Sequence, residues 1–107
     1  MKNYIFFVTT PNLEEGKRIA QLLVERKIVA CVNLIKGIYS IYRWKDKIEE
    51  NEEVMLIIKT SEDKTDELIN KINAIHSYEV PECVGIKIDK GSQSYLNWID
   101  NIVSNKN

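Results

Sequence analysis

The chain has 107 residues, of which 44% are hydrophobic and 29% are charged, and its formal net charge is -1. This length and balance predict one globular domain over residues 1–107, because two domains would each lack a sufficient core. The 15 basic and 16 acidic side chains are dispersed along the sequence, without the positive stripe that phosphate backbones require. We therefore expect no nucleic-acid partner.

The sequence does not indicate export or membrane insertion. The longest apolar run, residues 54–58, is about 5 residues long, whereas roughly 20 are needed to span a bilayer. Residues 1–12 lack the pattern of a signal peptide. Cys31 and Cys83 lie far apart, without the C-x-x-C spacing of zinc ribbons. These features favour a cytoplasmic protein in a reducing compartment.

The first half of the chain predicts a strand, a helix and a long hairpin. Aromatic and β-branched residues form a strand that Pro11 ends, and Asn12 caps a helix that runs to about Lys27, with Glu15 three residues after the cap. Residues 28–44 predict one long strand with a bulge at Gly37. The polar residues 45–53 are expected to turn the chain, and the apolar run over residues 54–60 predicts the next strand.

The second half predicts a helix that opens at Ser61 and ends near His76, a strand over residues 83–89, and a final helix over residues 92–103 capped by Ser92. The order βαββαβ with a terminal helix is typical of an α+β, ferredoxin-like sandwich in which two helices cover one sheet face. In that topology the second and fourth strands are opposite edges, so the two cysteines cannot bond within one chain.

Three common functions of this fold do not fit the residues. An RNA-recognition module displays stacking aromatics on its central strands, but the third strand reads "VMLIIKT". A copper chaperone carries paired cysteines in the first loop, and "TTPNLEEG" contains none. Acylphosphatase-like catalysis needs an arginine near that loop, whereas Arg18 falls inside the predicted helix.

The stretch "IHSYEVPE" contains the only histidine, His76, and admits two interpretations. At a helix C-terminus the protonated ring would act as a cap. Alternatively His76, with Glu79, Glu82 or a cysteine, offers imidazole and carboxylate or thiolate donors to a metal ion. Cys31 and His76 are also a conceivable nucleophile and base, but no local signature supports that pair, and a buried structural cysteine is the simpler interpretation.

The predicted hairpin is longer than a two-helix sandwich of this size can cover. It carries Tyr39, Tyr42 and Trp44, and apolar side chains and open strand edges in water favour association. We therefore expect a homo-oligomer in which the hairpin packs on a neighbouring copy. The alternative is that the terminal helix docks over the hairpin.

Three segments together resemble one known family. These are residues 30–60, from "ACVNLIKG" to "IIKT", residues 76–82, "HSYEVPE", and residues 94–99, "SYLNWI". In this order and spacing they are similar to the CutA family, the divalent-cation tolerance proteins, over essentially the whole chain. The family's A-C-V-N falls on residues 30–33, its G-x-x-S-x-Y-x-W on residues 37–44, and its H-P-Y-x-x-P-E on residues 76–82.

The resemblance implies a tight homotrimer with clefts between subunits and a role in tolerance to copper or another divalent cation, with no established catalytic activity. Ser77 stands where the family usually has proline. Where the family's copper sites are described, the ligands include a cysteine at the end of the first strand and a histidine pair. Those positions are Val8 and Ile75 here, and His76 alone is retained.

Two functions follow as expectations. The first is a non-enzymatic trimer that binds metal ions, through the candidate ligands His76, Cys31 and Glu79, or a small ligand at the subunit clefts. The second is a signalling or scaffold trimer that binds a metabolite or protein partner and affects metal tolerance indirectly. The candidate cleft residues are those with aromatic or charged side chains in the matching motifs: Trp44, Lys59, Tyr78 and Glu82.

Overall fold

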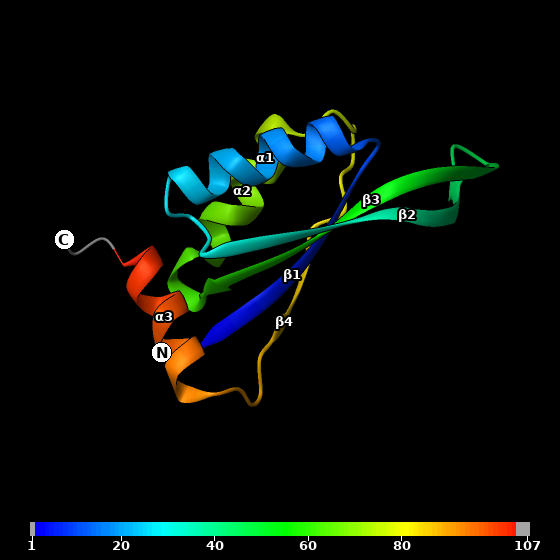
Figure 1. Ribbon diagram of the computed structural model, residues 1–107. Helices are drawn as coiled ribbons and strands as arrows, with labels where there is room; N and C mark the ends of the chain where they lie inside the picture. Colours follow the sequence, from blue (N-terminus) through cyan, green and yellow to red (C-terminus); the bar gives the residue numbers. More distant parts are fainter. Residues whose placement is uncertain (1, 105–107) are drawn as a thin grey trace.

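The computed structural model describes residues 2–104, which form one four-stranded antiparallel sheet and three α-helices. The sheet order β2-β3-β1-β4 places β2 and β4 at the edges, which confirms the ferredoxin-like α+β prediction. Figure 1 shows α1 and α2 side by side over one face of the sheet. The elements are β1 (Asn3–Thr10), α1 (Leu13–Glu25), β2 (Cys31–Trp44), β3 (Lys47–Ser61), a 3-10 turn (Glu62–Lys64), α2 (Thr65–Ile75), β4 (Val84–Lys87) and α3 (Gln93–Val103).

The main core lies between the sheet and the helix pair. Alternate residues of a strand point to the same face, so the even-numbered residues of β1 and β3 meet α1 and α2. The buried side chains of this layer are Phe6, Val8, Leu56 and Ile58 from the strands and Ile19, Leu23, Leu68 and Ile72 from the helices. Each of these residues is apolar, so burial of these two helix faces against the sheet is the main stabilising term.

The hairpin of β2 and β3 is longer than the sequence predicted. The expected turn over residues 45–53 is wrong, because only Lys45 and Asp46 turn the chain. Both adopt positive φ, 51° and 67°, as in the two-residue turns that match strand twist. Residues 47–53 pair with β2 instead, and the hairpin extends well beyond the helices (Figure 1).

The bulge predicted at Gly37 is confirmed. The register between β2 and β3 shifts between Ile35 and Ile38, and Gly37 has a φ of 79°, which a residue without a side chain adopts at little cost. The bulge bends the strand without ending it. It therefore separates the inner half of the hairpin, which lies on the core, from the outer half.

Several element boundaries differ from the predictions. Helix α1 ends at Glu25 because Lys27 takes a left-handed conformation, and residues 28–30 form a buried connection rather than the start of β2. Helix α2 does not open at Ser61, which still pairs with Asn3 at the end of β3. The predicted strand over residues 83–89 shrinks to Val84–Lys87.

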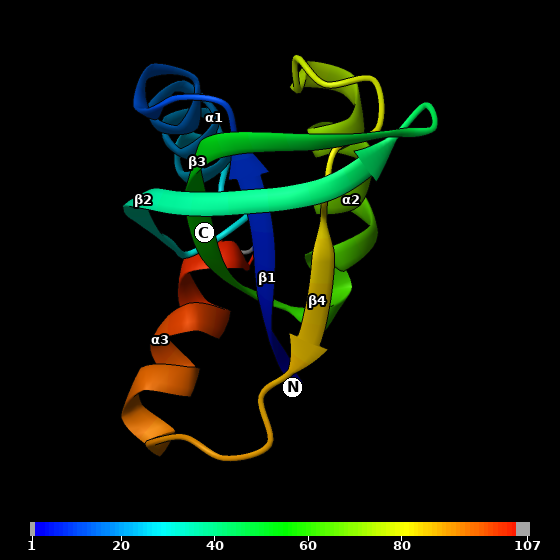
Figure 2. The same cartoon turned by 90° about the vertical axis from the view of Figure 1, so that its right-hand side faces the viewer.

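The terminal helix lies on the opposite side of the sheet from α1 and α2. Ser92 caps it as predicted, and Asn3, on the face of β1 opposite Phe6, donates a hydrogen bond to Asp100 at 2.8 Å. Figure 2 shows α3 away from the other helices, near the start of β1. The alternative in which this helix covers the hairpin is wrong, because α3 packs on Ala30 while Tyr39 stays 70% exposed.

The remainder of that sheet face is apolar and uncovered. Register places Val84 beside Phe7 and Ile86 beside Ile5. Val84 and Ile86 are 56% and 58% exposed, and Ile35 on the opposite edge is also exposed. A continuous apolar sheet face of this kind favours association with another surface. Among residues 2–104, no helix is both long and apolar enough to cross a membrane.

Candidate functional site

A buried histidine joins the end of α2 to β1. His76 is the C-cap of α2, its Nε2 lies 2.7 Å from the carbonyl oxygen of Thr9, and its Nδ1 lies 3.0 Å from the backbone nitrogen of Tyr78. A carbonyl only accepts and a backbone N–H only donates, so Nε2 carries the proton and Nδ1 accepts. Both ring nitrogens are engaged within the protein. The ring therefore holds the end of α2 against β1.

The residue after the histidine is held by a buried carboxylate of α1. The backbone N–H of Ser77 donates to Oε2 of Glu15 at 2.9 Å, and its hydroxyl donates to Oε1 at 2.7 Å. Burial alone raises the pKa of Glu15, but the two bonds from Ser77, with His76 and Arg18 nearby, outweigh it and hold the pKa below its usual value. Asn12 caps α1 as predicted, yet the Glu15 carboxylate accepts hydrogen bonds from Ser77 and not from the backbone of the cap residue.

The next residue of the turn reaches the hairpin. The Tyr78 hydroxyl donates to Oε2 of Glu53 at 2.6 Å, and its ring lies 4.7 Å from the His76 ring, centroid to centroid. Burial, followed by the bond to Glu53, raises the pKa of Tyr78 well above its usual value, so the proton stays on the phenol. Glu53 is only 6% exposed. Tyr78 therefore joins the turn after α2 to β3.

A half-open cavity of about 720 Å³ lies beside these contacts, between the hairpin and the turn after α2. Four aromatic side chains line it, Tyr39, Tyr42, Trp44 and Tyr78. Three carboxylates also line it, Glu53, Glu79 and Glu82. The volume lies within the roughly 300–1,000 Å³ that is typical of small-molecule sites. The arrangement is that of an acidic, aromatic binding pocket.

The predicted site residues fall in two places. Trp44, Tyr78, Glu79 and Glu82 line the cavity together, and His76 is buried behind it. Four of the predicted residues are therefore brought together by contacts between the hairpin and the turn.

The other two predicted residues lie elsewhere. Cys31 and Lys59 pair across β2 and β3, and both are near Asn33, which accepts from the Lys59 ammonium and lies 3.9 Å from the Cys31 sulfur. Burial, and then the neighbouring Cys31, raise the pKa of Tyr95 on α3. This cluster belongs to the interface between the sheet and α3. Within residues 2–104, no group of three or more histidine, cysteine or acidic side chains is placed to hold a metal ion.

The positions of the family's other copper ligands are apolar and belong to the core. Val8 is fully buried, and Ile75 packs against the same core cluster. The metal ligation predicted for His76, Cys31 and Glu79 stays a prediction, and the structure does not bring these three side chains together.

The sequence missed Glu53 and Glu15. Glu53 lies in the segment that was expected to be a turn. The only local signal for its role is its position just before an apolar strand. Glu15 was expected to serve the helix cap, and its partner Ser77 lies 62 residues away along the chain. No local pattern reports such a contact.

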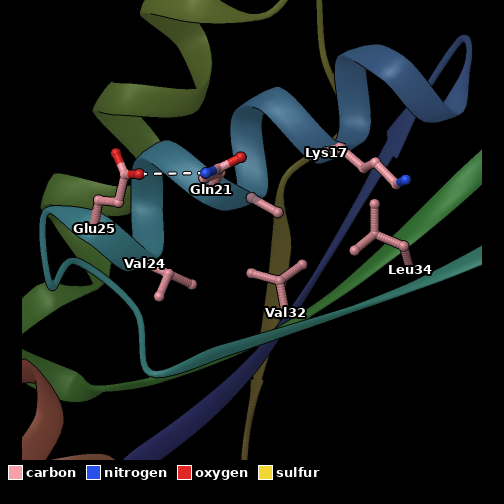
Figure 3. A pocket seen from close by; sticks show the side chains of 7 residues that line it. Lys17, Gln21, Val24, Glu25, Val32 and Leu34 are labelled. Atoms are coloured by element: carbon pink, nitrogen blue, oxygen red, sulfur yellow. Dashed lines mark hydrogen bonds between the residues drawn. The ribbon is translucent and has the colours of Figure 1, made fainter.

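A second, shallower hollow of about 410 Å³ lies between α1 and the edge strand β2. Figure 3 shows Val24, Val32 and Leu34 facing it, with Lys17 and Gln21 along its rim. Gln21 donates to Glu25 at 3.4 Å on the helix surface. Its apolar floor adjoins the open edge of β2, so this hollow is a surface for packing rather than for chemistry.

The antiparallel α+β sandwich with its projecting hairpin places the chain among the ferredoxin-like proteins. The family model described as CutA1 divalent ion tolerance protein matches residues 4–102. The chain therefore belongs to the CutA1 divalent ion tolerance family, as the resemblance indicated.

Relatives from a plant and an archaeon agree with this assignment. Protein CutA, chloroplastic, of Arabidopsis thaliana is 42% identical over 94% of this chain and 56% of its own length. Divalent-cation tolerance protein CutA of Archaeoglobus fulgidus is 42% identical over 96% of this chain and 99% of its own. The chain thus spans little more than half the length of the plant relative, but nearly all of the archaeal one.

Solved structures match the fold closely. CutA from Xylella fastidiosa has a TM-score of 0.94 with 34% identity, over 97% of this chain and 100% of that one. The periplasmic divalent cation tolerance protein CutA from A. fulgidus has a TM-score of 0.91 with 41% identity, over 97% and 100% of the two chains.

Proposed function

We propose that the protein is a homotrimeric, non-catalytic binding protein of the cytoplasm that holds a divalent cation of the copper class, or a small ligand, at clefts between subunits. The observation that carries the proposal is the uncovered apolar sheet face beside a projecting hairpin, with an acidic cavity lined by the hairpin's outer half. Covering that face with neighbouring copies would remove its side chains from water. The hairpin aromatics would then lie beside a second subunit.

The absence of catalysis is supported by where the conceivable nucleophile and base lie. Thr9, which binds His76, pairs with Met55, whereas Cys31 pairs with Lys59 four residues further along β3. At about 3.3 Å per strand residue this is a separation of roughly 13 Å along the strand alone.

The related A. fulgidus protein is described as periplasmic, so cell fractionation is the test of the cytoplasmic location.

Light scattering tests the assembly. We expect the wild-type protein to have three times the 12.5 kDa mass of one chain at low micromolar concentration. Ile86→Glu should reduce that mass, because it would bury an unpaired charge in the interface at a cost of several kcal/mol. The control is Lys87→Glu, one residue further along β4 and on the opposite sheet face. A wild-type mass equal to one chain would refute the assembly.

Calorimetric titration with Cu(II) tests the metal site. Among the predicted ligands, Glu79 lines the cavity and is exposed, so Glu79→Gln should weaken binding by at least about tenfold. Glu62→Gln, an exposed carboxylate at the far end of β3, should match wild type. Equal affinity for Cu(II) in all three proteins would show that the cavity is not the metal site. His76→Ala is less informative, because it also removes two internal hydrogen bonds.

A signalling or scaffold trimer is the alternative. It is favoured by the lack, within residues 2–104, of a preformed group of three or more metal-ligating side chains. In that case micromolar metal would leave the melting temperature unchanged, whereas a bound metabolite or protein partner would raise it.

A further inference from the structure

We infer that the cavity between the hairpin and the turn after α2 binds an organic cation that carries an alkylammonium or quaternary ammonium group. This inference rests on the proposed function, because it takes this cavity as the ligand site, and it names the ligand's chemistry. Three features carry it: the sign of the charge, a buried carboxylate, and the aromatic side chains that line the same cavity.

The charge that lines the cavity has one sign. Its ionisable walls are Glu53, Glu79 and Glu82, and in the described part of the chain no basic side chain lines it. Lys45, from the hairpin turn, reaches Glu79 at 4.0 Å, but both side chains are well exposed there. Such an exposed pair contributes little and is readily exchanged. A cationic ligand is therefore favoured over a neutral or anionic one.

Glu53 supplies a fixed negative charge at the base of the cavity. Its carboxylate accepts one hydrogen bond, from Tyr78 at 2.6 Å, and within residues 2–104 no second donor reaches it. The proton stays on Tyr78, whose pKa is raised by burial and then by Glu53. Because a buried carboxylate is costly without a compensating charge, a cation bound in the cavity would stabilise it.

The aromatic side chains suit an ammonium group. Tyr78 contacts the Glu53 carboxylate directly, and Tyr42 and Trp44 line the same cavity further along the hairpin, on the strand face that Ile38 and Glu53 share. The faces of such rings attract cations. The protein's own Lys45 already places its ammonium 5.6 Å from the centroid of the Trp44 ring. A ligand ammonium would take the same kind of position deeper in the cavity.

The same features disfavour a bare divalent ion as the best ligand. Such an ion needs several oxygen, nitrogen or sulfur donors at about 2.0–2.6 Å, and no group of three suitable side chains exists within residues 2–104. Aromatic faces provide no such donors, whereas a weakly hydrated organic cation uses both the rings and the carboxylates. A cavity of about 720 Å³ also has room for more than one ion.

Tryptophan fluorescence tests this with tetramethylammonium chloride as the probe. The chain has two tryptophans, so Trp98→Phe leaves Trp44 as the only reporter. At constant ionic strength, tetramethylammonium should change the Trp44 emission saturably, and the neutral isostere 3,3-dimethylbutan-1-ol should bind at least roughly tenfold more weakly. Equal responses to the two probes, or no saturable response to tetramethylammonium, would overturn the inference.

Variants then locate the site. Glu53→Gln should weaken tetramethylammonium binding by about tenfold, and Glu62→Gln should leave it unchanged. If Glu53→Gln does not fold, Glu79→Gln on the exposed wall provides the same comparison. Retention of full affinity in every folded cavity variant would overturn the inference.

A parallel titration with CuCl₂ separates the inference from the proposed function. Saturable copper binding without any tetramethylammonium response would overturn the inference and leave the proposed function standing. Tetramethylammonium binding without copper binding would support the inference and count against the metal branch of the proposed function.

Discussion

The Gly85→Ala variant is expected to melt roughly 5 to 20 °C below wild type, at equal protein concentration. Gly85 on β4 pairs with Phe6 on β1, and the aromatic ring lies across the glycine. A Cβ atom at position 85 would lie 2.5 Å from Cζ of Phe6, well inside van der Waals contact. Because Phe6 is buried in the core, the ring cannot move without displacing its neighbours. We expect a loss of about 1–3 kcal/mol in the free energy of unfolding.

A double-mutant cycle isolates the cause. The usual effect of Gly→Ala at a tolerant backbone position is a gain of about 0.4–1 kcal/mol, because the unfolded chain loses freedom. In a Phe6→Leu background the ring is gone, so the added methyl group should cost much less or stabilise the protein. An equal loss of stability in both backgrounds would show that contact with Phe6 is not the reason.

The sequence predicted the fold wherever a local signal decided the outcome. The Asn12 cap, the Gly37 bulge and the Ser92 cap each depend on a few neighbouring residues, and all three are confirmed. The predicted position of the hairpin turn was wrong because Lys45 and Asp46 are not the Asn-Gly or Asp-Gly pair that marks two-residue turns. Pairing with β2 then kept the polar residues 47–53 extended against their composition.

The site was predictable only in part. Trp44, Tyr78, Glu79 and Glu82 were selected by residue type and motif, and they do converge on one cavity. Glu53 could not be selected, because its role depends on a contact with Tyr78 from another element, 25 residues later. A choice of ligands by donor chemistry alone has the same limit, because it does not say which side chains the fold brings together. A side chain such as Cys31 has suitable atoms but lies in a different part of the sheet.

Glu15 and Ser77 show how this chain accommodates its departure from the family motif. A proline at position 77 would have no backbone N–H and no hydroxyl, whereas Ser77 gives both donors to the buried Glu15 carboxylate. The turn that forms one wall of the cavity is thereby tied to the first turn of α1. In this chain, two charge-assisted hydrogen bonds hold the turn where a proline ring would stiffen it.

Glu15→Gln is therefore expected to destabilise the protein by about 1–3 kcal/mol at neutral pH, measured by urea denaturation. An amide keeps one acceptor, but it presents an N–H group to a Ser77 donor. Glu14→Gln is the matched control, because Glu14 lies in the same first helical turn, is exposed, and experiences the same helix dipole. A similar loss in both variants would mean that the dipole, and not Ser77, accounts for the effect.

The pH dependence gives a sharper test of the same contact. The pKa of Glu15 is lowered in the folded protein, so the ionised carboxylate contributes stability above its unfolded pKa, about 4.3, and that contribution is lost as the pH falls through the folded value. The stability gap between wild type and Glu15→Gln should thus be largest near neutral pH and shrink below about pH 4. Ser77→Ala keeps the N–H but lacks the hydroxyl, so it should show a smaller gap with the same trend. In the Glu15→Gln background, Ser77→Ala should lower the free energy of unfolding by less than it does in the wild-type background, because the charged acceptor is already absent. A gap that stays constant with pH would mean that Glu15 acts through packing rather than through its charge.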